Sequence, residues 1–213
     1  MKALTNYLIW ILMVVISISC TKSEDEVPVP SYKIPQSFEE LKRLIDDPEW
    51  VNKFTSETGM TIANFGDLPL LFYGTFDINH KCIYDSAVPN NSQTNYALYT
   101  YSLNHNNDGF DSMSYETTQS TNYQDSAASD STGFQGIGTG NTYTITTYFK
   151  SHGTSGNVTY TALWIVTGNA TFGANFNITN FANAHSCLIM LSKSADPDNR
   201  VAQPGTVRVF VNQ

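Results

Sequence analysis

The fold is decided by two β-rich runs, residues 142–150 (Thr142-Tyr-Thr-Ile-Thr-Thr-Tyr-Phe-Lys150) and residues 158–167 (Val158-Thr-Tyr-Thr-Ala-Leu-Trp-Ile-Val-Thr167). Residues 152–157, His-Gly-Thr-Ser-Gly-Asn, separate them with turn-forming side chains. In the later run every second residue falls on one face, namely Val158, Tyr160, Ala162, Trp164 and Val166. Because side chains alternate along a strand and β-branched and aromatic residues favour strands, this segment predicts an antiparallel hairpin.

The same two-residue period extends to other parts of the chain. It begins after Asp67, where one face carries Leu70, Phe72, Gly74, Phe76 and Ile78. Shorter runs predict further strands at residues 81–86, 96–103, 110–118, 170–178, 186–193 and 205–211. In the last of these, Val207, Val209 and Val211 are expected to face inward. Residues 186–193 are apolar on both faces, which predicts a central or helix-covered strand. Residues 120–133 are polar without a period, which predicts a long surface loop.

Composition agrees with a β-rich chain. Only 14% of the 213 residues are charged, while Tyr and Phe number 12 each. We therefore expect an all-β domain over residues 36–213, built as an antiparallel barrel or a two-sheet sandwich of about eight or nine strands.

A short helical pair is expected before the strands, at about residues 37–58. Ser37 and Glu40 have the spacing of a capping box, and Asp47 followed by Pro48 is typical of a second helix start. Gly59 is expected to end that helix. We expect the pair to plug or buttress one end of the β-domain.

The first residues have the features of an export signal. Lys2 precedes an apolar run at residues 7–18, and Cys20 follows it. As a helix this run would be under about 20 Å long, too short for the roughly 30 Å of a bilayer core.

Residues 1–26 resemble the signal of a bacterial lipoprotein of the Bacteroidetes type. The processing box would be Ser17-Ile-Ser-Cys20, although the commonest box has Leu at the position of Ser17. The resemblance implies that residues 1–19 are removed, that Cys20 carries the lipid, and that residues 20–35 form a tether. The sequence just after Cys20 also resembles a surface-export tag, through Lys22, Glu24, Asp25 and Glu26. We therefore expect a lipid-anchored, surface-exposed protein of the outer membrane.

Charge limits the partners that we expect. The chain has 11 Lys and Arg against 19 Asp and Glu, a net charge of −8, and loss of Lys2 with the signal would make it −9. An acidic chain is a poor nucleic-acid binder, because phosphate neutralisation needs clustered cations. Membrane contact is expected through the lipid alone.

The segment Tyr73-Gly-Thr-Phe76 resembles the Gly-x-aromatic signature on the first strand of lipocalin-like barrels. The leading hypothesis is a non-catalytic domain that binds a glycan, a small ligand or a partner protein. Candidate ligand contacts are Tyr99, Tyr101 and Tyr148, whose alternative role is packing under the helices. The rival hypotheses are a structural or assembly protein of the envelope and a hydrolase with an unrecognised site.

The cysteines and histidines are the remaining residues that could form a disulfide or bind a metal. Cys82 and Cys187 could form a disulfide or remain two buried thiols. The four histidines lie singly, without the spacing of a zinc motif, so no metal site and no cofactor are predicted.

Four tripeptides resemble the acceptor motif of Bacteroidetes-type O-glycosylation: Asp85-Ser86-Ala87, Asp111-Ser112-Met113, Asp125-Ser126-Ala127 and Asp130-Ser131-Thr132. The resemblance implies modification at Ser86, Ser112, Ser126 or Ser131. Modified positions would have to lie in surface loops.

Overall fold

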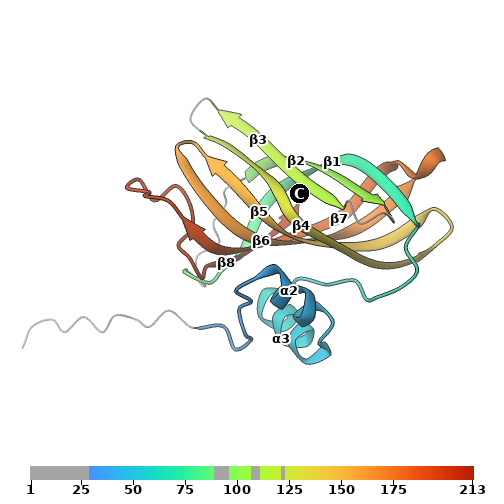
Figure 1. Cartoon of the computed structure of the whole chain (residues 1–213), viewed down its shortest axis with the longest axis horizontal. Helices are drawn as coiled ribbons and strands as arrows, with labels where there is room; N and C mark the ends of the chain where they lie inside the picture. The colour runs from blue at the N-terminus through green and yellow to red at the C-terminus, as the bar shows by residue number, and fades with distance from the viewer. Residues whose placement is uncertain (1–28, 89–95, 107–110, 121–122) are drawn as a thin grey trace, which may run out of the picture.

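A computed structural model describes residues 29–88, 96–106, 111–120 and 123–213. The described residues form eight antiparallel strands, each paired with the next, and β8 pairs back with β1 to close the ring (Figure 1). The strands are β1 (Leu71–Asp85), β2 (Tyr96–Asn106), β3 (Ser112–Ser120), β4 (Tyr123–Thr139), β5 (Thr142–Ser155), β6 (Val158–Phe172), β7 (Ile178–Lys193) and β8 (Val207–Asn212). A 3-10 turn, η1 (Ala174–Phe176), lies between β6 and β7. The prediction of an all-β fold is confirmed, and of its two architectures the chain adopts the barrel.

The barrel interior is filled by the alternating residues that the sequence placed on one face. The inward side of β6 carries all five residues predicted for it, from Val158 to Val166. One end of the barrel is packed with stacked or edge-on rings from four strands, namely Phe72, Phe76, Phe134, Phe172 and Phe181. That end is therefore closed by side chains.

Helices α2 (Phe38–Ile45) and α3 (Pro48–Thr58) begin and end where the sequence predicts. Ser37 caps α2 by accepting a hydrogen bond from the Glu40 N–H at 3.2 Å. Asp47 accepts one from Glu49 N–H at 2.9 Å, and Pro48 opens α3. Gly59 ends α3 with a φ of 71°, a left-handed conformation that favours glycine.

The two helices lie along the side of the barrel, and the prediction that they plug or buttress one end is wrong (Figure 1). They cover the outer faces of β5 to β8, which carry a second apolar cluster. Its buried members are Tyr32, Leu41, Leu44, Ile45, Trp50, Phe54, Met60, Ile62, Tyr148, Leu163, Ile165, Cys187, Ile189, Val207 and Val209. The double apolar face predicted at residues 186–193 is thus explained by helix cover on one side. Val207 and Val209 face the helices, so their predicted inward orientation is wrong.

Strand β4 corrects the predicted loop at residues 120–133. Its outer positions, such as Ser126 and Ala128, face solvent, and its inner positions include Asp125 and the small Ala127. This alternation of small and polar residues conceals a strand that pairs with β5 from Asp125 to Thr139. The strands predicted separately at 81–86 and 170–178 are also wrong, because the first continues β1 and the second spans the end of β6, η1 and the start of β7.

Candidate functional site

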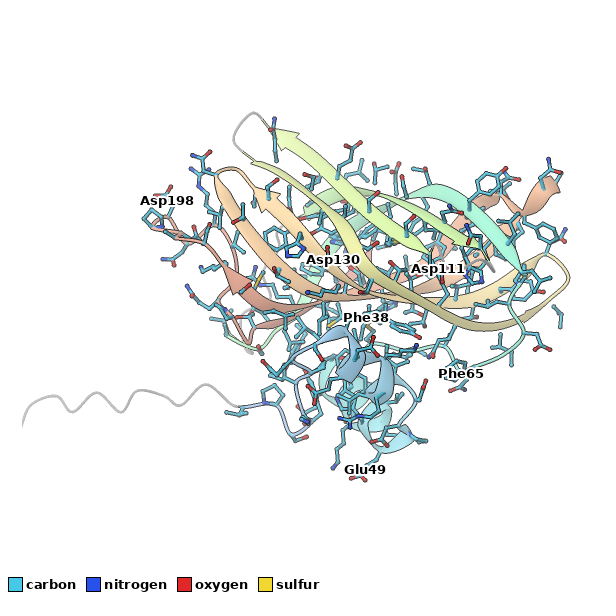
Figure 2. All side chains as sticks on the ribbon, in the orientation of Figure 1. Phe38, Glu49, Phe65, Asp111, Asp130 and Asp198 are labelled. Carbon is cyan, nitrogen blue, oxygen red and sulfur yellow. The ribbon has the colours of Figure 1, made fainter. Side chains whose placement is uncertain are left out.

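The barrel interior contains a pocket of about 170 Å³ near the end of the barrel where β5 turns into β6. The loop at residues 194–206 lines it as well, and Asp198 of that loop lies at the opposite end of the barrel from Phe65 (Figure 2). Five aromatic or imidazole rings and one carboxylate dominate the wall: His80, Tyr99, Tyr160, Trp164, Phe210 and Asp125.

Asp125 is the buried carboxylate of this pocket. It accepts hydrogen bonds from the Tyr160 hydroxyl at 2.6 Å and the Tyr99 hydroxyl at 2.9 Å. The Tyr115 hydroxyl in turn contacts that of Tyr160. Burial raises the pKa of Asp125 to about 6 in spite of the two hydroxyl donors. The protonated and ionised forms of Asp125 are therefore equally populated near pH 6.

Small residues on neighbouring strands let Tyr160 reach this carboxylate. Gly153 is the cross-strand partner of both Tyr160 and Ala127. A Cβ at Gly153 would lie 2.5 Å from the Tyr160 ring and 2.9 Å from the Ala127 Cβ. Since real side chains do not approach so closely, glycine at this position lets the tyrosine ring cross β5 to Asp125 on β4.

His80 forms the pocket wall on β1. Its ring stacks on Tyr99 at 4.4 Å and on Phe210 at 4.8 Å between ring centres. Its Nε2 lies 3.1 Å from both the Tyr101 hydroxyl and the Ser186 hydroxyl. Burial lowers the pKa of His80 to about 3, so the imidazole is neutral at physiological pH. Ser186 is completely buried and does not line the pocket, so its hydroxyl is out of reach of a substrate there.

Trp164 supplies the unusual feature of the pocket. Its side chain is 1% exposed, yet its indole Nε1 has no hydrogen-bond partner among the described residues. Trp50, the other tryptophan among the described residues, donates a hydrogen bond from Nε1 to the Lys33 carbonyl at 2.7 Å. A buried donor without a partner costs about 1–3 kcal/mol. This nitrogen is sealed within the packed side chains and is not accessible from the pocket.

No protein-family model, curated protein or solved structure matches this chain. In the described residues no helix has both the length and the apolar character needed to cross a membrane. Those residues also contain no group of three or more His, Cys, Asp or Glu side chains suited to a metal ion.

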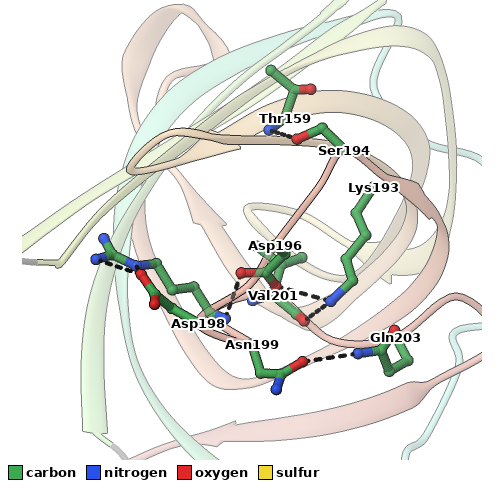
Figure 3. A network of polar contacts seen from close by, with 9 residues as sticks. Thr159, Lys193, Ser194, Asp196, Asp198, Asn199, Val201 and Gln203 are labelled. Atoms are coloured by element: carbon green, nitrogen blue, oxygen red, sulfur yellow. Dashed lines mark hydrogen bonds and ion pairs between the residues drawn. The ribbon is translucent and has the colours of Figure 1, made fainter.

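The rim of the pocket is charged but internally paired. Arg208 donates from Nε to Asp85 at 2.8 Å, and Arg200 lies 3.3 Å from Asp198. The loop is pinned by Asp196, whose carboxylate accepts from Lys193 Nζ at 2.8 Å (Figure 3). Asp196 also accepts from the Arg200 and Val201 amides, each at 2.9 Å. The hydrogen bond from Lys193 and those from the two backbone amides lower the pKa of Asp196 to about 2.

The three candidate tyrosines have different positions. Tyr99 lines the pocket, and Tyr101 lies behind it, completely buried against His80. Tyr148 lies on the outer wall and stacks on Phe38 of α2 at 5.9 Å between ring centres, so it packs under the helices (Figure 2). Sequence reasoning did not identify Asp125 or Trp164 as site residues.

Cys82 and Cys187 are free and buried, so the alternative of two buried thiols describes this structure. They are separated by β8, because Cys82 pairs with Phe210 and Cys187 with Val209. Two strand spacings of about 4.8 Å exceed the roughly 7 Å limit between the Cα atoms of a disulfide. Cys82 also lines the interior pocket whereas Cys187 faces the helices.

The proposed glycosylation sites are unequal. Ser86 is buried and accepts a hydrogen bond from the Val207 N–H at 2.9 Å, so the folded chain does not present it. Ser112 and Ser126 are exposed and Ser131 is half-buried, but all three lie on strands rather than in the expected loops. Cys20 lies outside the described residues.

An open groove of about 650 Å³ runs over strands β2 to β6. Its lining is mostly small residues, among them Thr100 and Ser102, together with larger ones such as Glu116 and His152. Its carboxylate, Glu116, is exposed, whereas the interior pocket holds the buried carboxylate of Asp125. The interior pocket is therefore the better candidate for a ligand site.

Proposed function

We propose that this chain is a lipid-anchored binding protein of the bacterial outer membrane whose barrel holds a small ligand in its interior. The observation that supports ligand binding is the carboxylate of Asp125 in the wall of an interior pocket lined by rings. Ligand sites are typically concave, mostly apolar and fitted with a few convergent polar groups. The pocket of about 170 Å³ lies below the usual range of about 300–1,000 Å³, so its occupant has few heavy atoms.

Binding without turnover is favoured over hydrolysis by the burial of the polar groups. The Ser186 hydroxyl and His80 Nε2 are within hydrogen-bond distance, but Ser186 is completely buried and does not line the pocket. A nucleophile and its general base must both reach the bound substrate. His80 is instead stacked between Tyr99 and Phe210, where its ring builds the pocket wall.

The test is a ligand-observed NMR screen of small polar, apolar and charged fragments against the full chain in a sugar-based detergent. We expect saturable binding of a hydrogen-bond donor that Asp125→Asn weakens by about fivefold, the effect of the roughly 1 kcal/mol by which a charged hydrogen bond exceeds a neutral one. Asp130→Asn is the matched control, because Asp130 is an exposed carboxylate on the same strand and does not line the pocket. Absence of saturable binding, or equal affinity for both variants, would refute the proposal and favour a structural role.

The anchor is tested separately at Cys20. In the proposed function the Cys20 thiol carries the lipid, so Cys20→Ala leaves the precursor unlipidated. We expect the variant to leave the membrane fraction and to lose incorporation of labelled fatty acid. Unchanged lipid labelling would contradict the anchoring proposal without affecting the ligand pocket.

A further inference from the structure

Six large apolar side chains are exposed at one end of the barrel. Because neighbouring strands are antiparallel, β1 begins, β4 ends and η1 joins β6 to β7 at this same end. It is the end marked by Phe65 in Figure 2, away from the loop with Asp198 that lines the interior pocket. We call these side chains, each between 44% and 70% exposed, the apolar crown: Phe65, Leu70, Leu71, Tyr73, Ile137 and Phe176.

The apolar crown is continuous along the end of the barrel. A Cβ at Gly66 would lie 2.9 Å from the Ile137 Cβ, so the segment before β1 touches the end of β4. Tyr73 in β1 pairs with Asn177, the residue that follows η1. The first residues of β1 connect these two contacts. Single apolar residues on a surface are ordinary, but a continuous patch of several hundred Å² marks an interaction site.

Phe176 is held outward in an unfavourable backbone conformation. Its φ is 60° and that of Asn175 is 63°, both in the left-handed region. A bulky residue is rare there, because its Cβ comes close to a neighbouring carbonyl oxygen. The ring gains little burial in the single chain, since Phe176 is 53% exposed. Burial of the ring against a second surface would offset this cost.

The charge at this end favours a second copy of the chain as that surface. The apolar crown lies within residues 64–75, 136–143 and 173–179, and the only charged side chain of these segments is Asp67. Anionic bilayer surfaces attract clustered Lys and Arg, which the segments lack. The whole chain carries a net charge of −8, so two copies repel each other through most of their surfaces. Contact through nearly uncharged ends keeps the acidic remainder apart.

We propose that two copies of the chain associate through their apolar crowns in an isologous, end-to-end contact. In such a contact the same patch faces itself across a twofold axis. With about 200 Å² for each side chain and about half of it exposed, one apolar crown presents roughly 600 Å². Two of them bury roughly 1,200 Å², the lower limit for a specific interface, so we expect a dissociation constant of about 1–100 µM. The contact leaves the interior pocket of each copy free.

Photo-crosslinking tests which surface covers the apolar crown. The full chain, with a photoreactive benzoyl group on the ring of Phe176, is reconstituted into phosphatidylcholine vesicles and irradiated. We expect a crosslinked dimer of the chain. Benzoylphenylalanine in place of Leu98 is the control and should give no dimer, because Leu98 is 50% exposed on β2, outside the apolar crown.

A pair of substitutions measures the contribution of the apolar crown. Phe176→Asn and Ile137→Thr are combined, because asparagine tolerates the left-handed conformation and threonine favours strands. Sedimentation equilibrium of the full chain in a density-matched sugar-based detergent, over about 1–300 µM, should show self-association weakened at least tenfold. Ile83→Thr with Leu98→Thr is the matched control, which removes two exposed apolar side chains elsewhere and should stay within about twofold of the parent. Urea unfolding verifies that each variant is folded.

The outcomes separate this inference from the proposed function. A dimer crosslinked at Phe176, with self-association that the crown substitutions weaken, supports the inference. Crosslinks to lipid alone would overturn it and identify a membrane contact. Absence of a crosslinked dimer in vesicles, or equal self-association of the crown variant and its control, would also overturn it, and the vesicle result decides if sedimentation disagrees. None of these results depends on a ligand in the interior pocket, so the fragment screen tests the proposed function separately.

Discussion

Replacing Asp125 by Asn should change how the stability of the barrel depends on pH. The pKa of Asp125 is raised to about 6 by burial in the folded chain, against about 3.9 for an aspartate in an unfolded chain. Between these two values the folded state binds a proton that the unfolded state does not. The contribution of Asp125 to folding stability therefore falls as pH rises through this window, and that contribution is largest below about pH 4.

The size of this effect follows from the pKa difference. One pKa unit corresponds to about 1.4 kcal/mol, so a rise from about 3.9 to about 6 corresponds to about 3 kcal/mol. The hydroxyls of Tyr99, Tyr115 and Tyr160 face Asp125. Burial raises the pKa of Tyr115 well above its usual value, so that tyrosine stays neutral throughout. We therefore assign the effect to Asp125.

Urea unfolding from about pH 4 to about pH 7.5 tests this reasoning. We expect the stability of Asp125→Asn relative to the parent to increase by up to about 3 kcal/mol over this range, because asparagine does not ionise. Asp67→Asn, at an exposed position, is the control and should follow the parent at every pH. A difference between Asp125→Asn and the parent that stays constant with pH would refute the burial argument.

Three further changes probe the parts that build the site. Gly153→Val should lower the unfolding free energy by about 1–3 kcal/mol in urea, because a Cβ there would lie 2.5 Å from the Tyr160 ring; an unchanged midpoint would contradict this. Phe54→Ala should lower it by about 3–5 kcal/mol, since Phe54 is completely buried between helix and barrel, and a loss below about 1 kcal/mol would show that the helices are not part of the core. Asp196→Ala should speed amide hydrogen exchange at Arg200 and Val201, because their N–H groups donate hydrogen bonds to the Asp196 carboxylate. Exchange as slow as in the parent would show that other contacts hold the loop.

Residue patterns predicted the fold best where one strand face is apolar. β1 shows this alternation, whereas the middle parts of β5 and β6 are buried on both faces. The capping residues of the helices were also predicted correctly. β4 was missed because its inner face holds Asp125, Ala127 and glycines, which leave room for large rings from other strands. The position of the helices was missed because the sequence does not show which apolar face of β5 to β8 points out of the barrel. That orientation is known only when the closed ring is seen.

The candidate site was predictable only in part. Tyr99 and the inward orientation of Trp164 follow from the strand period, but Asp125 was noticed only as the first residue of a modification motif. The pocket unites residues from β2, β4 and β6, which do not pair directly with one another. Only the width and closure of the ring determine that their side chains meet. The Asp-x-Ala alternation within a polar segment was the available signal for an inward carboxylate.

Ring closure also affects the order in which the chain can fold. β1 pairs with β8, so contacts such as Lys81 to Val211 join residues from opposite ends of the domain. Helices α2 and α3, made early, rest on β5 to β8, which are made last. Such long sequence separations slow folding, because the loop entropy is lost before the contacts form. A nascent chain therefore gains its core only when β8 has emerged, and deleting β8 would expose both the barrel interior and the apolar face of the helices.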